Sequence, residues 1–147
     1  DKFLVKGKLI TYTEGRKKNQ DMRFLAHQDL THPNYPMVVL VNHASASGAE
    51  IVAGALQAHQ RALILGIPTY GRITVQSVIP LSDNSGLRLT TAKFYTPLDE
   101  PDIQDKGIIP DIIMEQPESE TPINFGDLNS DAQLQRAFNI LTFQMVH

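Results

Sequence analysis

The chain has 147 residues and a formal net charge of −3, and the absence of a basic run argues against nucleic acid as a partner. Hydrophobic residues make up 41% of it and charged residues 20%, a balance that allows an ordinary globular core. It contains no cysteine, which excludes disulfide bonds, thiolate metal sites and a cysteine nucleophile.

The first part of the chain predicts strands joined by polar turns. Strand formers fill residues 3–13, a polar turn over 14–19 follows, and residues 21–25 predict a short returning strand. Residues 27–36 are rich in proline, asparagine and aspartate, which is typical of a loop.

A strand, a helix and a second strand are predicted next. The continuous apolar run over 36–42 favours a strand of a parallel sheet, buried on both faces. A helix is predicted over 48–61, with an apolar stripe formed by Ile51, Val52, Ala55, Leu56 and His59. Residues 62–65 predict the second strand, so the unit should be a right-handed crossover.

The rest of the chain predicts a hairpin, loops and a terminal helix. Residues 73–81 and 86–95 read as paired strands around a turn at 82–85, and 97–110 as a loop. A short strand is expected at 111–114 and an irregular segment at 115–129. The helix predicted over 131–146 has Ser130 as its cap and an inward face of Leu134, Ala137, Phe138, Leu141 and Met145.

Two serines, Ser45 and Ser47, lie where the apolar strand passes into the helix. Backbone N–H groups at the start of a helix are unpaired, so an oxyanion can be stabilised there. Serine is also a common helix cap, and spacing alone favours the capping interpretation. The residues therefore leave a nucleophile and a cap as alternatives.

Four sequence segments, taken in order along the chain, resemble segments of a known protein family. The segment VLVNHASASGAEIVAGAL at 39–56 resembles the nucleophile motif of the C-terminal processing peptidases, which are tail-specific serine proteases. GIPTYGRITVQ at 66–76 is similar to the family segment that carries a catalytic lysine and glutamine. LTTAKFYTP at 89–97 with the isoleucine-rich stretch to residue 112, and the upstream pieces at 3–7 and 12–16, resemble the flanking segments.

The resemblance assigns roles to four positions. Ser47, the second serine of the Ser-Ala-Ser motif, matches the nucleophile, and the backbone N–H of Gly48 matches one half of the oxyanion hole. Arg72, 25 residues after Ser47, stands where the family has its lysine base, and Gln76 matches the family glutamine. The other half of the oxyanion hole is expected upstream of Phe3.

Arg72 departs from the family pattern in a way that matters chemically. A buried lysine can lose its proton and act as a base, whereas an arginine keeps its proton in a protein. Three explanations remain open. The protein is a weakened or inactive peptidase; another group serves as the base, with His43 the nearest candidate; or residue 72 has been altered from its natural identity. Glu50 is interpreted either as a first-turn carboxylate favoured by the helix dipole or as a residue near the active site.

The resemblance implies an α/β fold with a ClpP/crotonase-like core of stacked strand-strand-helix units. Residues 1–147 would be the C-terminal part of the catalytic domain, with an upstream core segment and a PDZ domain outside them. It implies peptide-bond hydrolysis without metal or cofactor, protein or peptide substrates with exposed C-termini, a possible homo-oligomer, and export to the bacterial periplasm or cell envelope. The alternative function is a pseudopeptidase that binds peptides or proteins without cleaving them.

Overall fold

The computed structural model describes residues 2–28, 32, 34–98, 103–118 and 123–146, and it confirms an α/β fold with two separate sheets. One sheet is antiparallel and has the strand order β2-β1-β6-β5. Its strands are β1 (Leu9–Gly15), β2 (Met22–Leu25), β5 (Thr74–Pro80) and β6 (Gly86–Tyr95). The predicted hairpin of β5 and β6 is confirmed, with Pro80 paired opposite Gly86 next to the turn.

The second sheet is parallel and has the order β3-β4-β7. It consists of β3 (Val38–Val41), β4 (Leu63–Gly66) and β7 (Ile112–Ile113). The helix α1 (Gly48–Ala58) connects β3 to β4, which confirms the predicted strand-helix-strand unit. The strands β3 and β4 run in the same direction, so the carboxyl end of β3 lies beside the segment that follows β4.

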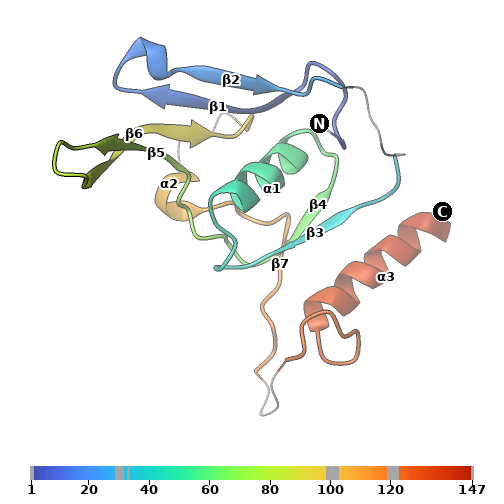
Figure 1. The fold of residues 1–147 in the computed structure, drawn as a ribbon. Coiled ribbons are helices and arrows are strands. Elements are labelled where there is room, and N and C mark those ends of the chain that lie inside the picture. Colours follow the sequence, from blue (N-terminus) through green and yellow to red (C-terminus); the bar gives the residue numbers. More distant parts are fainter. Residues whose placement is uncertain (1, 29–31, 33, 99–102, 119–122, 147) are drawn as a thin grey trace.

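The helix α1 lies between the two sheets, and the helix α3 (Ala132–Val146) lies on the other side of the parallel sheet (Figure 1). The elements are joined by a buried apolar cluster with members from α1, the parallel sheet, the residue before β5 and the loop before β7. Its members are Val41, Ala53, Ile64, Ile73 and Ile108. Burial of these side chains packs α1 against β3, β4 and the segment that leads into β5.

The first strand begins later than predicted. Residues 3–8 form turns rather than a strand, because Gly7 adopts a positive φ of 84° and its N–H bonds to the carbonyl of Ala26. The strand β1 instead continues through Gly15, and a short 3₁₀ helix (Lys18–Gln20) leads into β2. The predicted polar turn is therefore shorter, and the returning strand over residues 21–25 is confirmed as β2.

Two burial predictions in the central unit are wrong. The strand β3 is not buried on both faces, since it is an edge strand of its sheet and Leu40 is 37% exposed. The helix stripe is rotated, so that Ala53 and Gly54 are buried whereas Val52 is 55% exposed. The helix also ends at Ala58, and His59 after it bonds through Nε2 to the carbonyl oxygen of Leu9 at 2.7 Å.

The C-terminal region differs from prediction in its cap and its apolar face. Asp131, not Ser130, caps α3, since its Oδ1 accepts the N–H of Leu134 at 2.9 Å. Ala137 is buried as expected, but Phe138 is 53% exposed. The loop predicted over 97–110 contains a four-residue helix, α2 (Ile103–Lys106), beside the segment that leads to β7.

Candidate active site

Ser47 is the last residue before α1, and its backbone has φ 55° and ψ −115°. This conformation is uncommon for a residue with a side chain and costs about 1–3 kcal/mol unless its surroundings hold it. The side chain is exposed at the point where the chain turns from β3 into the helix. A serine on a strained strand-to-helix turn is the arrangement that presents a nucleophile in several hydrolases.

Glu50 holds this turn in place. Its side chain is fully buried, with 0% exposure, and it lies one turn into α1. Its Oε2 accepts the backbone N–H of Ser47 at 3.0 Å and the backbone N–H of Arg72 at 3.1 Å. Because two N–H groups from distant parts of the sequence share one carboxylate oxygen, the two segments are fixed side by side.

The other oxygen of Glu50 organises the segment before Arg72. Its Oε1 accepts the Thr69 hydroxyl at 2.5 Å and the Gly71 N–H at 2.7 Å. The Thr69 hydroxyl in turn accepts the N–H of Ile108 at 2.7 Å. The carboxylate therefore has four hydrogen-bond donors, which offset the free energy that its burial costs.

Gly71 can only be glycine in this arrangement. Its φ is +80°, and a Cβ on it would lie 2.8 Å from the backbone nitrogen of Gly107. The backbone of residues 105–107 thus packs directly against the segment that carries Arg72, and Asp105 donates its N–H to the Gly71 carbonyl at 3.0 Å. The site is assembled from the ends of β3 and β4 and from the loop before β7.

Arg72 reaches the site through its backbone and extends its side chain over an aromatic ring. Its guanidinium carbon lies 5.1 Å from the centroid of Tyr70, and the side chain is exposed. Tyr70 donates its backbone N–H to the carbonyl of Ser45 at 3.0 Å. The backbone of Tyr70 is therefore tied to the turn that carries Ser47, and its side chain, 51% exposed, carries the Arg72 guanidinium over its ring.

The remaining candidates occupy different places. Gly48 is the first residue of α1, and a Cβ built on it meets no atom within 4 Å, so the space beside it is open. Gln76 lies on β5 opposite Thr90, with an exposed side chain, and it is not among the groups that bond to Glu50. His43 is exposed in the turn after β3.

The two serines at the junction differ in their surroundings. Ser45 is half-buried, and its Oγ accepts the N–H of Asn42 at 3.2 Å, so its hydroxyl is engaged within the turn. Ser47 is exposed, and its backbone N–H bonds to the Glu50 carboxylate, which is one half of a capping box at the start of α1. The Ser47 hydroxyl makes no cap hydrogen bond, so the bond of the Glu50 carboxylate to the Ser47 N–H, rather than the serine hydroxyl, caps the helix start beside the strained backbone.

Sequence reasoning underestimated Glu50 and missed Thr69. A glutamate three residues after a serine at a helix start is the signature of a capping box, and it could have identified the bond to Ser47. The bonds to Thr69, Gly71 and Arg72 join residues about twenty positions apart, and no local pattern predicts them.

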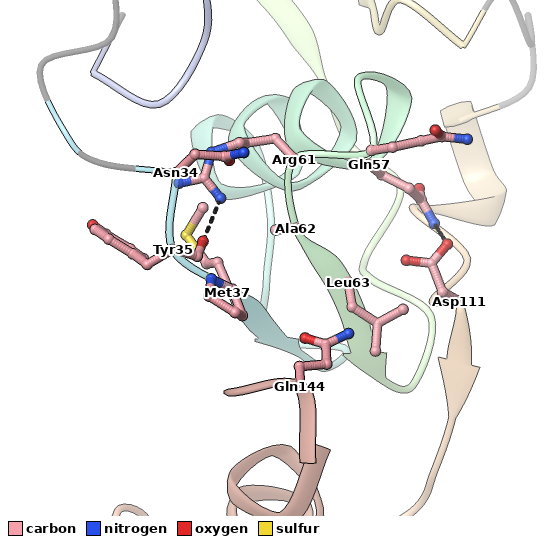
Figure 2. Close-up of a pocket in the computed structure, with 11 residues that line it drawn as sticks. Asn34, Tyr35, Met37, Gln57, Arg61, Ala62, Leu63, Asp111 and Gln144 are labelled. Carbon is pink, nitrogen blue, oxygen red and sulfur yellow. Dashed lines mark hydrogen bonds between the residues drawn. The ribbon is translucent and has the colours of Figure 1, made fainter. Parts of the chain in front are cut away.

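A separate cavity of about 560 Å³ lies at the opposite end of α1 from Ser47. Figure 2 shows Gln57 bonded to Asp111 on one side of it, Arg61 bonded to the Tyr35 carbonyl on the other, and Gln144 of α3 reaching it. Within the described residues, no group of three His, Asp or Glu side chains could hold a metal ion, and no helix is long and apolar enough to cross a membrane.

Residues 2–114 match the family model described as Peptidase family S41. Two curated relatives are a carboxy-terminal-processing protease of Bartonella bacilliformis, 53% identical over 80% of this chain, and a carboxyl-terminal-processing protease of Synechocystis sp., 42% identical over 90% of it. The chain spans 26% and 30% of their lengths.

A solved structure titled photosystem II D1 C-terminal processing protease has a similar fold. It superposes with a TM-score of 0.70 at 31% identity, over 88% of this chain and 32% of the other.

Proposed function

This chain belongs to peptidase family S41, and we propose that it carries the nucleophile of a serine-type endopeptidase that hydrolyses peptide bonds near substrate C-termini. The observation that carries the proposal is the strained backbone of Ser47, which the buried carboxylate of Glu50 holds at an exposed helix start. Strain of this kind persists where the surrounding structure maintains it, and it concentrates at functional sites.

In the proposed reaction, the Oγ of Ser47 attacks the substrate carbonyl carbon and forms an acyl-enzyme, which water then hydrolyses. The backbone N–H of Gly48 serves as one oxyanion donor. The Ser47 N–H already bonds to Glu50, so it is not the group that we assign to this task. Gln76, on the strand that follows Arg72, is given a supporting catalytic role on the family resemblance alone.

Arg72 limits this activity. A guanidinium does not lose its proton in a protein, so Arg72 cannot take the proton of Ser47. A serine without a base is a poor nucleophile, and we infer that the natural protein is slow unless another group, such as His43, acts as the base. The second candidate function is peptide binding without cleavage, and the exposed Arg72 guanidinium is the observation that favours it.

The substrates, the cellular location and the oligomeric state are also part of the proposal. Protein or peptide substrates with exposed C-termini fit the names of the relatives. Export to the bacterial periplasm or cell envelope is proposed on the family resemblance. A related chloroplastic peptidase of Arabidopsis thaliana is 51% identical over 52% of this chain, so a plastid setting is the competing location. Self-association to a homo-oligomer is proposed on the family resemblance alone.

The test is the Arg72→Lys substitution in the full-length protein. General-base assistance contributes typically 10²- to 10⁴-fold, so a lysine that can deprotonate should raise the rate of peptide cleavage by about 10²-fold or more. The double variant Ser47→Ala, Arg72→Lys should lose this gain, and Arg72→Gln should not produce it.

Two results would contradict this assignment. Full activity of the natural protein would show that another base operates, and His43→Gln would then be tested. An unchanged rate in folded Arg72→Lys would favour the pseudopeptidase.

A further inference from the structure

The Arg72 side chain is a cation without a protein counter-ion among the residues that the structure describes. Its guanidinium is exposed and lies 5.1 Å from the centroid of the Tyr70 ring. No carboxylate in the described ranges forms an ion pair with it, and the Glu50 carboxylate bonds to its backbone N–H instead. The charge is therefore available to a ligand.

The backbone that carries the cation and its aromatic partner is tied down at two points. The Arg72 backbone is tied to Glu50 at 3.1 Å, and the Tyr70 backbone is tied to the carbonyl of Ser45 at 3.0 Å. Contact with an aromatic face attracts the guanidinium and reduces its freedom. A guanidinium held in this way keeps its N–H edge free, and that edge matches the two oxygens of a carboxylate.

We propose that Arg72 and Tyr70 form a binding site for the C-terminal carboxylate of a peptide that lies beside Ser47. The proposal deepens the function above and rests on its assignment of Ser47 as the nucleophile. The open space at Gly48 leaves room for the peptide chain, and hydrolysis at Ser47 would create such a carboxylate. In this proposal Arg72 binds the carboxylate of a peptide end instead of accepting a proton from Ser47.

This site has a definite ligand preference. A peptide with a free C-terminal carboxylate should bind about tenfold more tightly than the same peptide with a C-terminal amide, because the amide cannot form a charge-assisted bidentate pair. The preference should weaken as salt is added, since the guanidinium is exposed. Acetate should compete for the site, whereas acetamide should not.

The experiment uses the Ser47→Ala variant, so that cleavage cannot interfere. An alanine peptide with a fluorescent label at its N-terminus is titrated in both its acid and its amide form, with fluorescence anisotropy as the readout. Arg72→Gln in this background should abolish the difference between the two forms. Tyr70→Phe should retain it, and Tyr70→Leu should reduce it. Arg88→Gln removes another exposed arginine, on β6, and serves as the matched control.

A second measurement does not depend on peptide affinity. The Nε–H resonance of Arg72 is followed by NMR during titration with acetate and with acetamide, and it should move only with acetate. Equal binding of the acid and amide peptides, or a preference that survives Arg72→Gln, would overturn the proposal. So would the absence of both peptide binding and an acetate-induced shift.

The two proposals can fail separately. Rate enhancement by Arg72→Lys tests the nucleophile, whereas the acid-over-amide preference is measured in a variant that has no nucleophile. A protein that prefers the acid peptide but gains nothing from Arg72→Lys would be a peptide-end binding protein.

Discussion

The buried carboxylate of Glu50 accepts the backbone N–H of Ser47 at 3.0 Å, across the first turn of α1. The same oxygen accepts the N–H of Arg72, 22 residues further along the chain. One side chain therefore fixes both the conformation of the proposed nucleophile and its separation from the residue at the proposed base position. Glu50 acts through Ser47 and Arg72, and we regard it as a positioning residue.

Glu50→Gln should destabilise the protein. A carboxamide has one oxygen, so in either orientation its NH₂ group faces two of the four donors. Buried donors left without an acceptor cost about 1–3 kcal/mol each, so the free energy of unfolding should fall by about 2 kcal/mol or more. Urea denaturation followed by circular dichroism measures this. Glu115→Gln, at an exposed site, should change it by less than about 0.5 kcal/mol. Equal stability of the Glu50 variant and the natural protein would contradict the assigned network.

Ser47→Gly should be more stable than Ser47→Ala. Both variants lose the hydroxyl, but only glycine adopts a φ of 55° without strain, and we expect a difference of about 1 kcal/mol after the greater flexibility of the unfolded glycine chain is included. The same pair at Ser45, which is not among the residues with positive φ, should show the opposite order. Denaturant midpoints of the four variants provide the comparison, and an alanine variant at 47 that matches the glycine variant would count against backbone strain.

Gly54→Ala should destabilise the protein although alanine favours helices. A Cβ at Gly54 would lie 2.4 Å from the Cγ2 of Thr96, in the interface between α1 and the end of β6. Overpacking of this kind costs about 1–3 kcal/mol. Thr96→Ser removes that methyl group and should recover part of the loss in the double variant, a non-additivity that thermal unfolding can detect. Additive effects of the two substitutions would show that the clash is absent.

Asp131 should make the docking of α3 sensitive to acid. Its burial opposes ionisation, but hydrogen bonds from the Leu134 N–H, the Gln116 amide and the Gly126 N–H outweigh this and hold its pKa below the ordinary value of 3.8. Because the pKa is lower in the folded state, the stabilisation is complete above the unfolded pKa and is lost as the pH falls through the folded one.

Asp131→Ala should therefore cost about 1 kcal/mol at pH 7, as for a lost helix cap. The difference between the variant and the natural protein should shrink as the pH falls below about 4. Urea unfolding across this range tests the sign, with Glu118→Ala, at an exposed carboxylate, as the control. A difference that grows in acid would contradict the assignment.

Local sequence patterns were sufficient to predict many of the secondary-structure elements. The apolar run before Asn42, the small residues after it and the second apolar run identified β3, α1 and β4, because side-chain periodicity and turn residues act over a few positions. The β5–β6 hairpin followed from two strand-forming runs around a polar turn. The same local information placed a serine at the start of a helix, and the order of the motifs indicated the family.

Long-range packing decided the rest. The exposure of Leu40 and Val52 depends on which elements cover an edge strand and a helix face, and spacing along the chain does not contain that information. The positive φ of Ser47 is held in the folded protein in part by the hydrogen bond from its N–H to the Glu50 carboxylate. That carboxylate is buried by other elements, so the sequence near Ser47 does not predict this support. The bonds from Thr69, Gly71 and Arg72 to Glu50 form only when the ends of β3 and β4 meet, so the site exists as a product of the tertiary fold.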